Sequence, residues 1–133
     1  MIEWKSTLDT GIVEIDNQHH EWVKRSNDFS IAVNKGATKE IILEFLIAMN
    51  NYTIFHFGEE EALMHNINYP EIDTQLIQHQ LFLGKQAWFL ESLRFAEDVA
   101  AKQTAEFIEN WITYHIFVED KKIGEYMAHM PKE

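Results

Sequence analysis

Four segments of this chain place apolar residues every three or four positions, the spacing that gathers them on one face of an α-helix. Alternation of apolar and polar residues, which marks a half-buried strand, is not sustained anywhere. Only two prolines and five glycines interrupt the 133 residues, so the helices should be long. The pattern predicts an all-α fold with helices at about 15–35, 38–65, 70–95 and 104–128.

The segments between these helices are short, with Gly36 suited to end the first helix and Pro70 to open the third. The longest connection is expected around Asp98–Gln103. Short connections favour antiparallel neighbours. We therefore expect a single domain over residues 1–133, an up-down-up-down antiparallel four-helix bundle, with an N-terminal arm over residues 1–14.

The charge balance narrows the choice of partners. Eleven Lys and Arg stand against 22 Asp and Glu, which gives a formal net charge of −11. Such a charge repels phosphate backbones and anionic lipid headgroups, so we expect neither nucleic acid nor a membrane as partner. The chain has no cysteine, which excludes thiolate metal sites and fits a reducing compartment. With no signal-peptide pattern and no long continuous apolar run, the expected location is cytoplasmic.

Polar residues interrupt all four apolar stripes. Each stripe carries a histidine, and two of the four segments add a carboxylate. Unpaired carboxylates in a bundle core would be strongly destabilising unless positive charge lies between them. Imidazole nitrogen and carboxylate oxygen together suit iron, manganese or zinc. The candidate metal ligands are His19, His56, Glu60, His79, His115 and Asp120, with Gln75 on the same stripe as His79.

The spacing of these residues is consistent with one shared site. His56 and Glu60 are four residues apart, which places them on the same helix face. His115 and Asp120 are five apart, about 140° around an ideal helix, so Asp120 needs a distorted turn to join the site. A single histidine on an apolar stripe is usually an ordinary core residue, but coincidence on four stripes is much less common. The Glu-x-x-His motif of ferritin-like di-iron bundles and the His-Glu-x-x-His motif of metalloproteases are both absent.

With these residues in place, the whole chain resembles the bacterial hemerythrins. Ile15-Asp16-Asn17-Gln18-His19 resembles the first-helix motif of that family, and His56-Phe57-Gly58-Glu59-Glu60-Glu61 resembles its His-Phe-x-x-Glu-Glu element. Tyr69-Pro70 opens the third helix as in the family, with His79 in register. Trp111-Ile112-Thr113-Tyr114-His115-Ile116, followed by Asp120, resembles the fourth-helix motif.

The resemblance implies two non-haem iron ions joined by an oxo or hydroxo bridge. It implies His19 and His56 on one iron, which keeps a position open for dioxygen, and His79 and His115 on the other. Glu60 and Asp120 are implied as bridging ligands. Apolar residues that flank these ligands in sequence are candidates for a dry oxygen pocket, namely Trp22, Phe57, Trp111, Ile112 and Ile116.

Gln75 departs from the family pattern, which has a histidine four residues before the second histidine of the third helix. A glutamine oxygen could bind the second iron weakly, a water could fill the place, or that iron could be labile. The function that the resemblance implies is dioxygen binding for carriage, storage or sensing, in a protein that is not an enzyme. Two alternatives stay open: peroxidase-like, oxidase-like or nitric-oxide chemistry at a vacancy near Gln75, and a degenerate mono-iron site.

Overall fold

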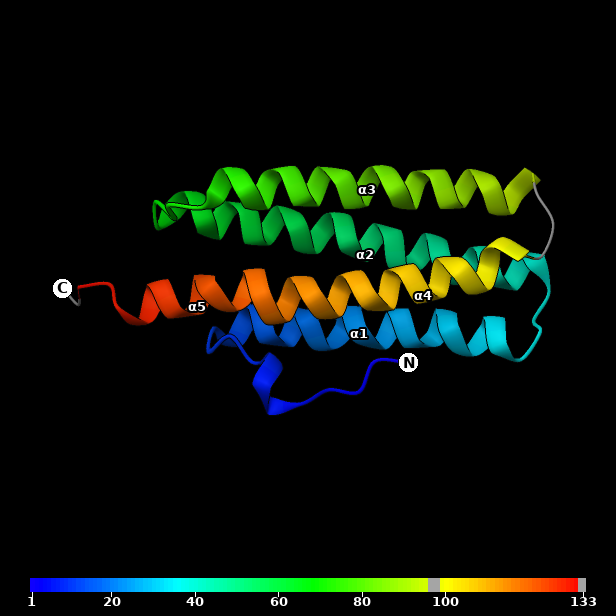
Figure 1. Cartoon of the computed structure of the whole chain (residues 1–133), viewed down its shortest axis with the longest axis horizontal. Coiled ribbons are helices and arrows are strands. Elements are labelled where there is room, and N and C mark those ends of the chain that lie inside the picture. Colours follow the sequence, from blue (N-terminus) through cyan, green and yellow to red (C-terminus); the bar gives the residue numbers. More distant parts are fainter. Residues whose placement is uncertain (96–98, 132–133) are drawn as a thin grey trace.

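A computed structural model describes residues 1–95 and 99–131 of the chain, and within them the fold is entirely helical. Four long helical rods lie side by side in an up-down-up-down bundle (Figure 1), so the predicted fold class is confirmed. The elements are η1 (Ser6–Leu8), α1 (Val13–Asn34), α2 (Lys39–Asn66), α3 (Ile72–Phe95), α4 (Val99–Tyr114), η2 (His115–Asp120) and α5 (Lys121–Ala128).

The helix ends differ from the sequence-based bounds by a few residues. The α1 helix begins at Val13, and α3 begins at Ile72 rather than at Pro70. The largest difference is in the fourth rod, which begins at Val99 rather than near Thr104. Most of the connection expected over Asp98–Gln103 is therefore helical, and its first residue lies outside the described residues. The alanines and the lysine in this stretch are strong helix formers, and no breaker opposes them.

The fourth rod is not one regular helix. Between α4 and α5, residues His115–Asp120 form a π-helical turn, η2. A π-helical turn forms i→i+5 hydrogen bonds, one residue longer than those of an α-helix, and such turns are frequent at functional sites. The distortion that the five-residue spacing of His115 and Asp120 requires is thus present at those two residues.

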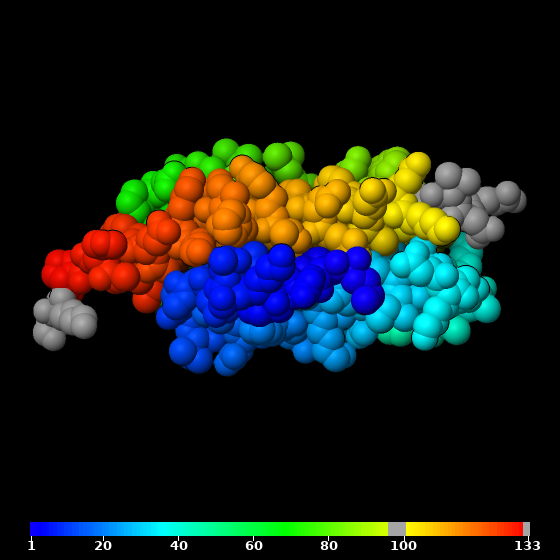
Figure 2. Space-filling view, turned by 60° about the horizontal axis from the view of Figure 1, so that its bottom comes forward, coloured from blue at the N-terminus to red at the C-terminus, as the bar shows by residue number. Residues whose placement is uncertain are grey.

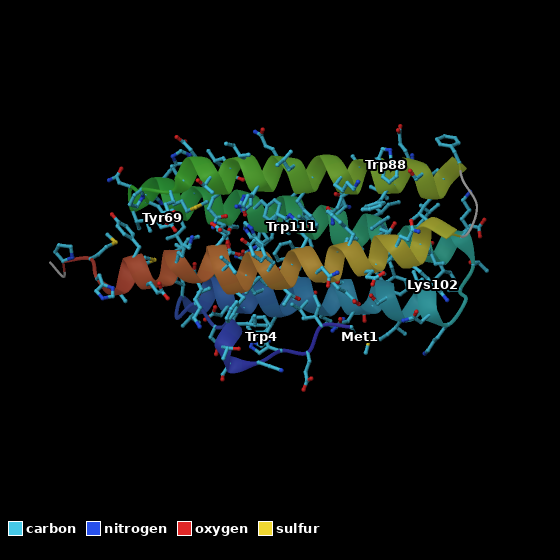
Figure 3. The ribbon with its side chains drawn as sticks, viewed as in Figure 1. Met1, Trp4, Tyr69, Trp88, Lys102 and Trp111 are labelled. Carbon is cyan, nitrogen blue, oxygen red and sulfur yellow. The ribbon has the colours of Figure 1, made fainter. Side chains whose placement is uncertain are left out.

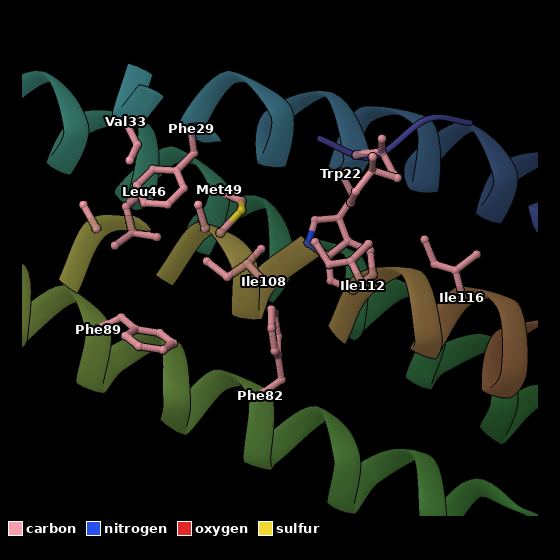
Figure 4. Close-up of a cluster of buried hydrophobic side chains, with 14 of the residues drawn as sticks. Trp22, Phe29, Val33, Leu46, Met49, Phe82, Phe89, Ile108, Ile112 and Ile116 are labelled. Atoms are coloured by element: carbon pink, nitrogen blue, oxygen red, sulfur yellow. The ribbon is translucent and has the colours of Figure 1, made fainter. Parts of the chain in front are cut away.

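The main apolar core runs from the end of the bundle where α1 passes to α2 and α3 passes to α4 as far as Trp22, Phe57 and Ile116. Figure 4 shows side chains from all four rods meeting there, with Phe29, Leu46, Phe82 and Ile108 among them. These four side chains are at most 1% exposed. Burial of large apolar side chains stabilises the fold by about 1.5–3 kcal/mol each. A smaller apolar cluster of Met64, Tyr69 and Ile123 lies toward the other end, and the buried polar residues lie between the two.

The α2 helix is long and apolar enough, by length and composition, to cross a membrane, with a mean hydropathy of 1.2 over its best 18-residue window. Because hydropathy is averaged over the window, the mean is high although each continuous apolar run is short. Only 28% of the window is buried in the bundle. The helix also packs along α1 and α3 and buries Glu60 in the bundle centre, as a core helix of a bundle does.

The N-terminal arm lies against the outer surface of α1 and the fourth rod (Figure 2). The Met1 amino group pairs with the Glu109 carboxylate at 3.1 Å. Further along the arm, the Trp4 and His20 rings lie 3.8 Å apart, and the Lys121 ammonium donates to the Thr7 carbonyl at 2.9 Å. The arm therefore binds both sides of the groove between α1 and the fourth rod.

The arm crosses α5 so closely at Gly124 that a Cβ there would overlap the Thr10 carbonyl oxygen. We predict that Gly124→Ala destabilises the protein by about 1–3 kcal/mol, because backbone must move to admit the methyl group. The matched control is Gly84→Ala in α3, where a Cβ meets no atom within 4 Å. That change should stabilise by about 0.5–1 kcal/mol through helix propensity. Chemical denaturation measures both, and equal effects of the two substitutions would refute the close contact.

Candidate metal centre

The six candidate ligands predicted from the sequence come together in the bundle interior. The α1 helix supplies His19, α2 supplies His56 and Glu60, α3 supplies His79, and η2 supplies the remaining two. Every one of these side chains is at most 1% exposed. They form two groups of donor atoms, each within 4.8 Å: His19, His56, Glu60 and Asp120, and Glu60, His79, His115 and Asp120. Both carboxylates belong to both groups.

Glu60 divides its two oxygens between the groups. Its Oε2 lies 3.2 Å from His56 Nε2 and 3.5 Å from His19 Nε2. Its Oε1 lies 3.1 Å from His79 Nε2 and 3.9 Å from His115 Nε2. One oxygen therefore faces each pair of imidazoles.

Asp120 divides its oxygens in the same way. Its Oδ2 lies 3.0 Å from His19 Nε2, and its Oδ1 lies 3.1 Å from His115 Nε2. The π-helical turn makes this possible, since its longer i→i+5 repeat brings Asp120 to the face that carries His115. Two carboxylates that each present one oxygen to each side form a frame for two adjacent cations.

Outer hydrogen bonds at Nδ1 hold three of the four histidines with Nε2 pointing inward, and His19 Nδ1 has no such partner among the described residues. In three of the four, Nδ1 lies against a side-chain oxygen: His56 against Gln18 at 2.8 Å, His79 against Glu61 at 2.8 Å, and His115 against Gln78 at 2.9 Å. Because these oxygens can accept, Nδ1 carries a proton in each case, and Nε2 is the nitrogen that can bind a metal once it is free of its own proton. Such outer hydrogen bonds are typical of metal-binding histidines.

These supporting residues were not predicted from the sequence, although a signal is present. A Gln-His pair occurs twice, at Gln18-His19 and at Gln78-His79. Each glutamine hydrogen-bonds a histidine on the next rod: Gln18 bonds His56, and Gln78 bonds His115. The bonded histidine belongs to the same donor group as the histidine that follows the glutamine. The first two rods and the last two rods therefore build their donor groups with the same arrangement of side chains.

Aromatic rings lie against the imidazoles. The Phe57 ring stacks on His79 with centroids 3.7 Å apart, and Trp111 stacks on His115 at 4.4 Å. Trp22 lies 5.1 Å from the His56 ring. Figure 3 shows Trp111 within the bundle, between the fourth rod and the α2 and α3 helices. These rings fix the imidazole planes and exclude water on their side of the cluster.

Of the five residues predicted to form an oxygen pocket, Trp22, Phe57, Ile112 and Ile116 are at most 1% exposed, and Trp111 is half-buried. All five belong to the apolar core or pack against it. Figure 4 shows Trp22 beside Ile112, with Ile116 farther along the same rod. The structure thus supplies an apolar wall, and its role toward oxygen stays a prediction.

The electrostatics of the cluster favour positive charge at its centre. Burial lowers the pKa of His19, but the adjacent Asp120 and Glu60 carboxylates outweigh burial and raise that pKa to about 9. The same balance raises the pKa of His115 to about 10. Burial raises the pKa of both carboxyls as well, yet the surrounding imidazoles hold the pKa of Glu60 and that of Asp120 below the usual range. Without metal, protons on His19 and His115 supply positive charge that the carboxylates require.

The residues present fit two metal ions. His19 Nε2, His56 Nε2, Glu60 Oε2 and Asp120 Oδ2 are buried without a hydrogen-bond partner among the described residues. The Nε2 atoms of His79 and His115 lie 3.2 Å apart. Two nitrogens bound at right angles to one metal, with bonds of about 2.1 Å, would be separated by about 3 Å. The donor set of imidazole and carboxylate suits iron, manganese or zinc.

Gln75 lies at the edge of the cluster and is fully buried. Its Nε2 donates to Asp120 Oδ1 at 3.0 Å, and its Oε1 has no hydrogen-bond partner among the described residues. The structure thus places Gln75 on the side of the cluster that contains His79 and His115.

This fold and site define a four-helix-bundle protein with a buried histidine–carboxylate metal centre. Residues 10–127 match the family described as Hemerythrin HHE cation binding domain, and the chain belongs to the hemerythrin family. It is similar to a Bacteriohemerythrin of Clostridium acetobutylicum, with 25% identity over 126 residues that cover 92% of this chain and 98% of the relative. A Bacteriohemerythrin of Pseudomonas aeruginosa is 28% identical over 130 residues, which cover 98% of this chain and 84% of the relative. One of Campylobacter jejuni is 29% identical over 117 residues, 84% of each chain.

The family assignment confirms the resemblance found in the sequence. It also agrees with the expectation of a binding protein rather than an enzyme. Together with the buried cluster, it indicates a non-haem metal site.

We predict that Gln78→Leu lowers the affinity of the site for a divalent metal by about 10- to 100-fold, because His115 loses the acceptor that orients it. Competition between the protein and a chelator for Co²⁺ measures this change. The control is Gln80→Leu, an exposed glutamine two residues further along α3. If both variants bind Co²⁺ as the parent does, the outer hydrogen bond does not support the metal site.

Proposed function

We propose that this protein binds dioxygen reversibly at a pair of non-haem iron ions in the bundle centre, bridged by Glu60, Asp120 and an oxo or hydroxo group. The observation that carries the proposal is the division of carboxylate oxygens: each of the two shared carboxylates presents one oxygen to each pair of imidazoles. A site for one metal does not require that arrangement. Relatives named Bacteriohemerythrin support the same conclusion.

When bound, two ferrous ions can supply two electrons to dioxygen. The chain supplies the surroundings that keep such an exchange reversible. The buried carboxylates offset the charge of the cations, and the outer hydrogen bonds to Gln18, Glu61 and Gln78 keep the imidazoles in place. Trp22 and Phe57 form an apolar wall beside the site, and excluding water there limits loss of the bound oxygen as peroxide.

The role that follows is carriage or storage of dioxygen, with sensing through a separate partner as a further use of the same binding. A cytoplasmic location is part of the proposal, because a chain without cysteine fits a reducing compartment.

The direct test is a visible absorption spectrum of the protein loaded anaerobically with Fe²⁺. Spectra are recorded before oxygen, after oxygen and after degassing. We expect a charge-transfer band that appears with oxygen and fades on degassing. A permanent ferric spectrum after one exposure would contradict reversible binding, and absence of any band would contradict the paired site.

We predict that Glu60→Gln lowers metal content and abolishes most of the thermal stabilisation that metal gives the parent. The parent should gain about 2.7 kcal/mol when free metal is a hundred times its Kd. Glu59→Gln is the matched control, since it makes the same charge change at the exposed neighbouring residue. Metal analysis and thermal melts with and without metal provide the readouts. Equal metal-dependent stabilisation of the two variants would exclude Glu60 as a ligand.

A further inference from the structure

Gln75 lies beside the cluster, and the donor geometry gives it no role as a ligand. It is fully buried, four residues before His79, and its amide nitrogen donates to Asp120 Oδ1. That oxygen also faces His115 Nε2 at 3.1 Å. The Gln75 amide therefore lies beside the metal position of His79 and His115.

The orientation of this amide follows from chemistry. An ionised carboxylate can only accept hydrogen bonds, so the group that faces Asp120 must be the NH₂ of Gln75. The amide oxygen is then turned away from Asp120 Oδ1, and it is buried without a partner among the described residues. A buried carbonyl oxygen without a donor is costly, and it is normally satisfied by water or a ligand.

The internal repeat of the site shows what Gln75 changes. In the first half of the chain, the residue four positions before His19 is Ile15, which is apolar and 4% exposed. The corresponding residue before His79 is Gln75, whose nitrogen cannot coordinate a metal. Among the described residues, each metal position therefore receives two imidazoles and one oxygen from each carboxylate. Non-haem iron with imidazole and carboxylate ligands of this number keeps places open for exogenous ligands.

We propose that the metal position of His79 and His115 keeps an open place beside Gln75 and binds a small anionic or diatomic ligand there. The pair of metals then takes two exogenous ligands, one on each side, rather than one. The Gln75 amide lines this second place, where its free N–H can donate to the ligand and its oxygen can accept from a protonated one. The inference rests on the proposed function, because it requires the metal pair.

The test is a titration of the di-iron(III) protein with azide, after metal analysis has shown two irons per chain. Calorimetry counts the ligands, and the azide infrared band shows whether they occupy two environments. We expect two azide ions per metal pair in the parent. Gln75→His should bind one, because the new imidazole fills the second place.

Two further variants separate coordination from positioning. Gln75→Leu should still bind two azide ions, with the second weakened about three- to tenfold through loss of hydrogen bonds. Gln86→Leu is the matched control, since Gln86 is equally buried on the same helix stripe but contacts none of the cluster residues in a described hydrogen bond. It should bind azide as the parent does.

The remaining outcomes contradict either the second ligand place or the metal pair itself. One azide ion in the parent but two in Gln75→Leu would mean that the amide oxygen itself occupies the place as a ligand. One azide ion in both would mean that no second place exists. Fewer than two irons per chain before any azide is added would refute the proposed function instead, so the two failures are distinguishable.

Discussion

The structure depends on the burial of two negative charges, those of Glu60 and Asp120, in the centre of a helical bundle. Neither carboxylate is exposed, and no lysine or arginine pairs with them among the described residues. An uncompensated buried charge of this kind costs several kcal/mol. Four imidazoles surround the pair, and the carboxylates raise the pKa of His19 to about 9 and that of His115 to about 10, so these two can carry the compensating protons. Cations between the carboxylates would offset the same cost, so metal binding and bundle stability are linked.

The position of these charges explains the irregular fourth rod. On the α2 helix, Glu60 follows His56 by four positions, so a regular helix places both on the same face. On the fourth rod, Asp120 follows His115 by five positions, and the π-helical turn η2 accommodates the additional residue. The arm then packs next to this turn, through Lys121 to the Thr7 carbonyl and through the close approach of Thr10 to Gly124. The arm therefore contacts the first turn of α5, which directly follows η2.

The sequence predicted the parts of the site that interrupt a periodic pattern. A histidine such as His79 or a carboxylate such as Glu60 is visible because it replaces an apolar residue on a stripe. The supporting residues were not predicted, because Gln18 and Gln78 lie off the core stripes and act across rods. The contact between Gln18 and His56 spans 38 residues, so it depends on how α1 crosses α2. The start of the fourth rod at Val99 was also not predicted, since local helix propensity there outweighed the weak apolar pattern.

The two halves of the site show how a repeated plan can yield unequal environments. Both halves use a Gln-His pair on one rod, a second histidine on the next, and a shared carboxylate four or five residues later. They differ at the residue four positions before the first histidine, which is the buried, apolar Ile15 in one half and Gln75, whose amide donates to Asp120, in the other. A buried amide oxygen without a partner costs free energy, and a ligand or a water at the site can recover that cost. We therefore attribute the polar side chain at this position to a ligand of the site rather than to the fold.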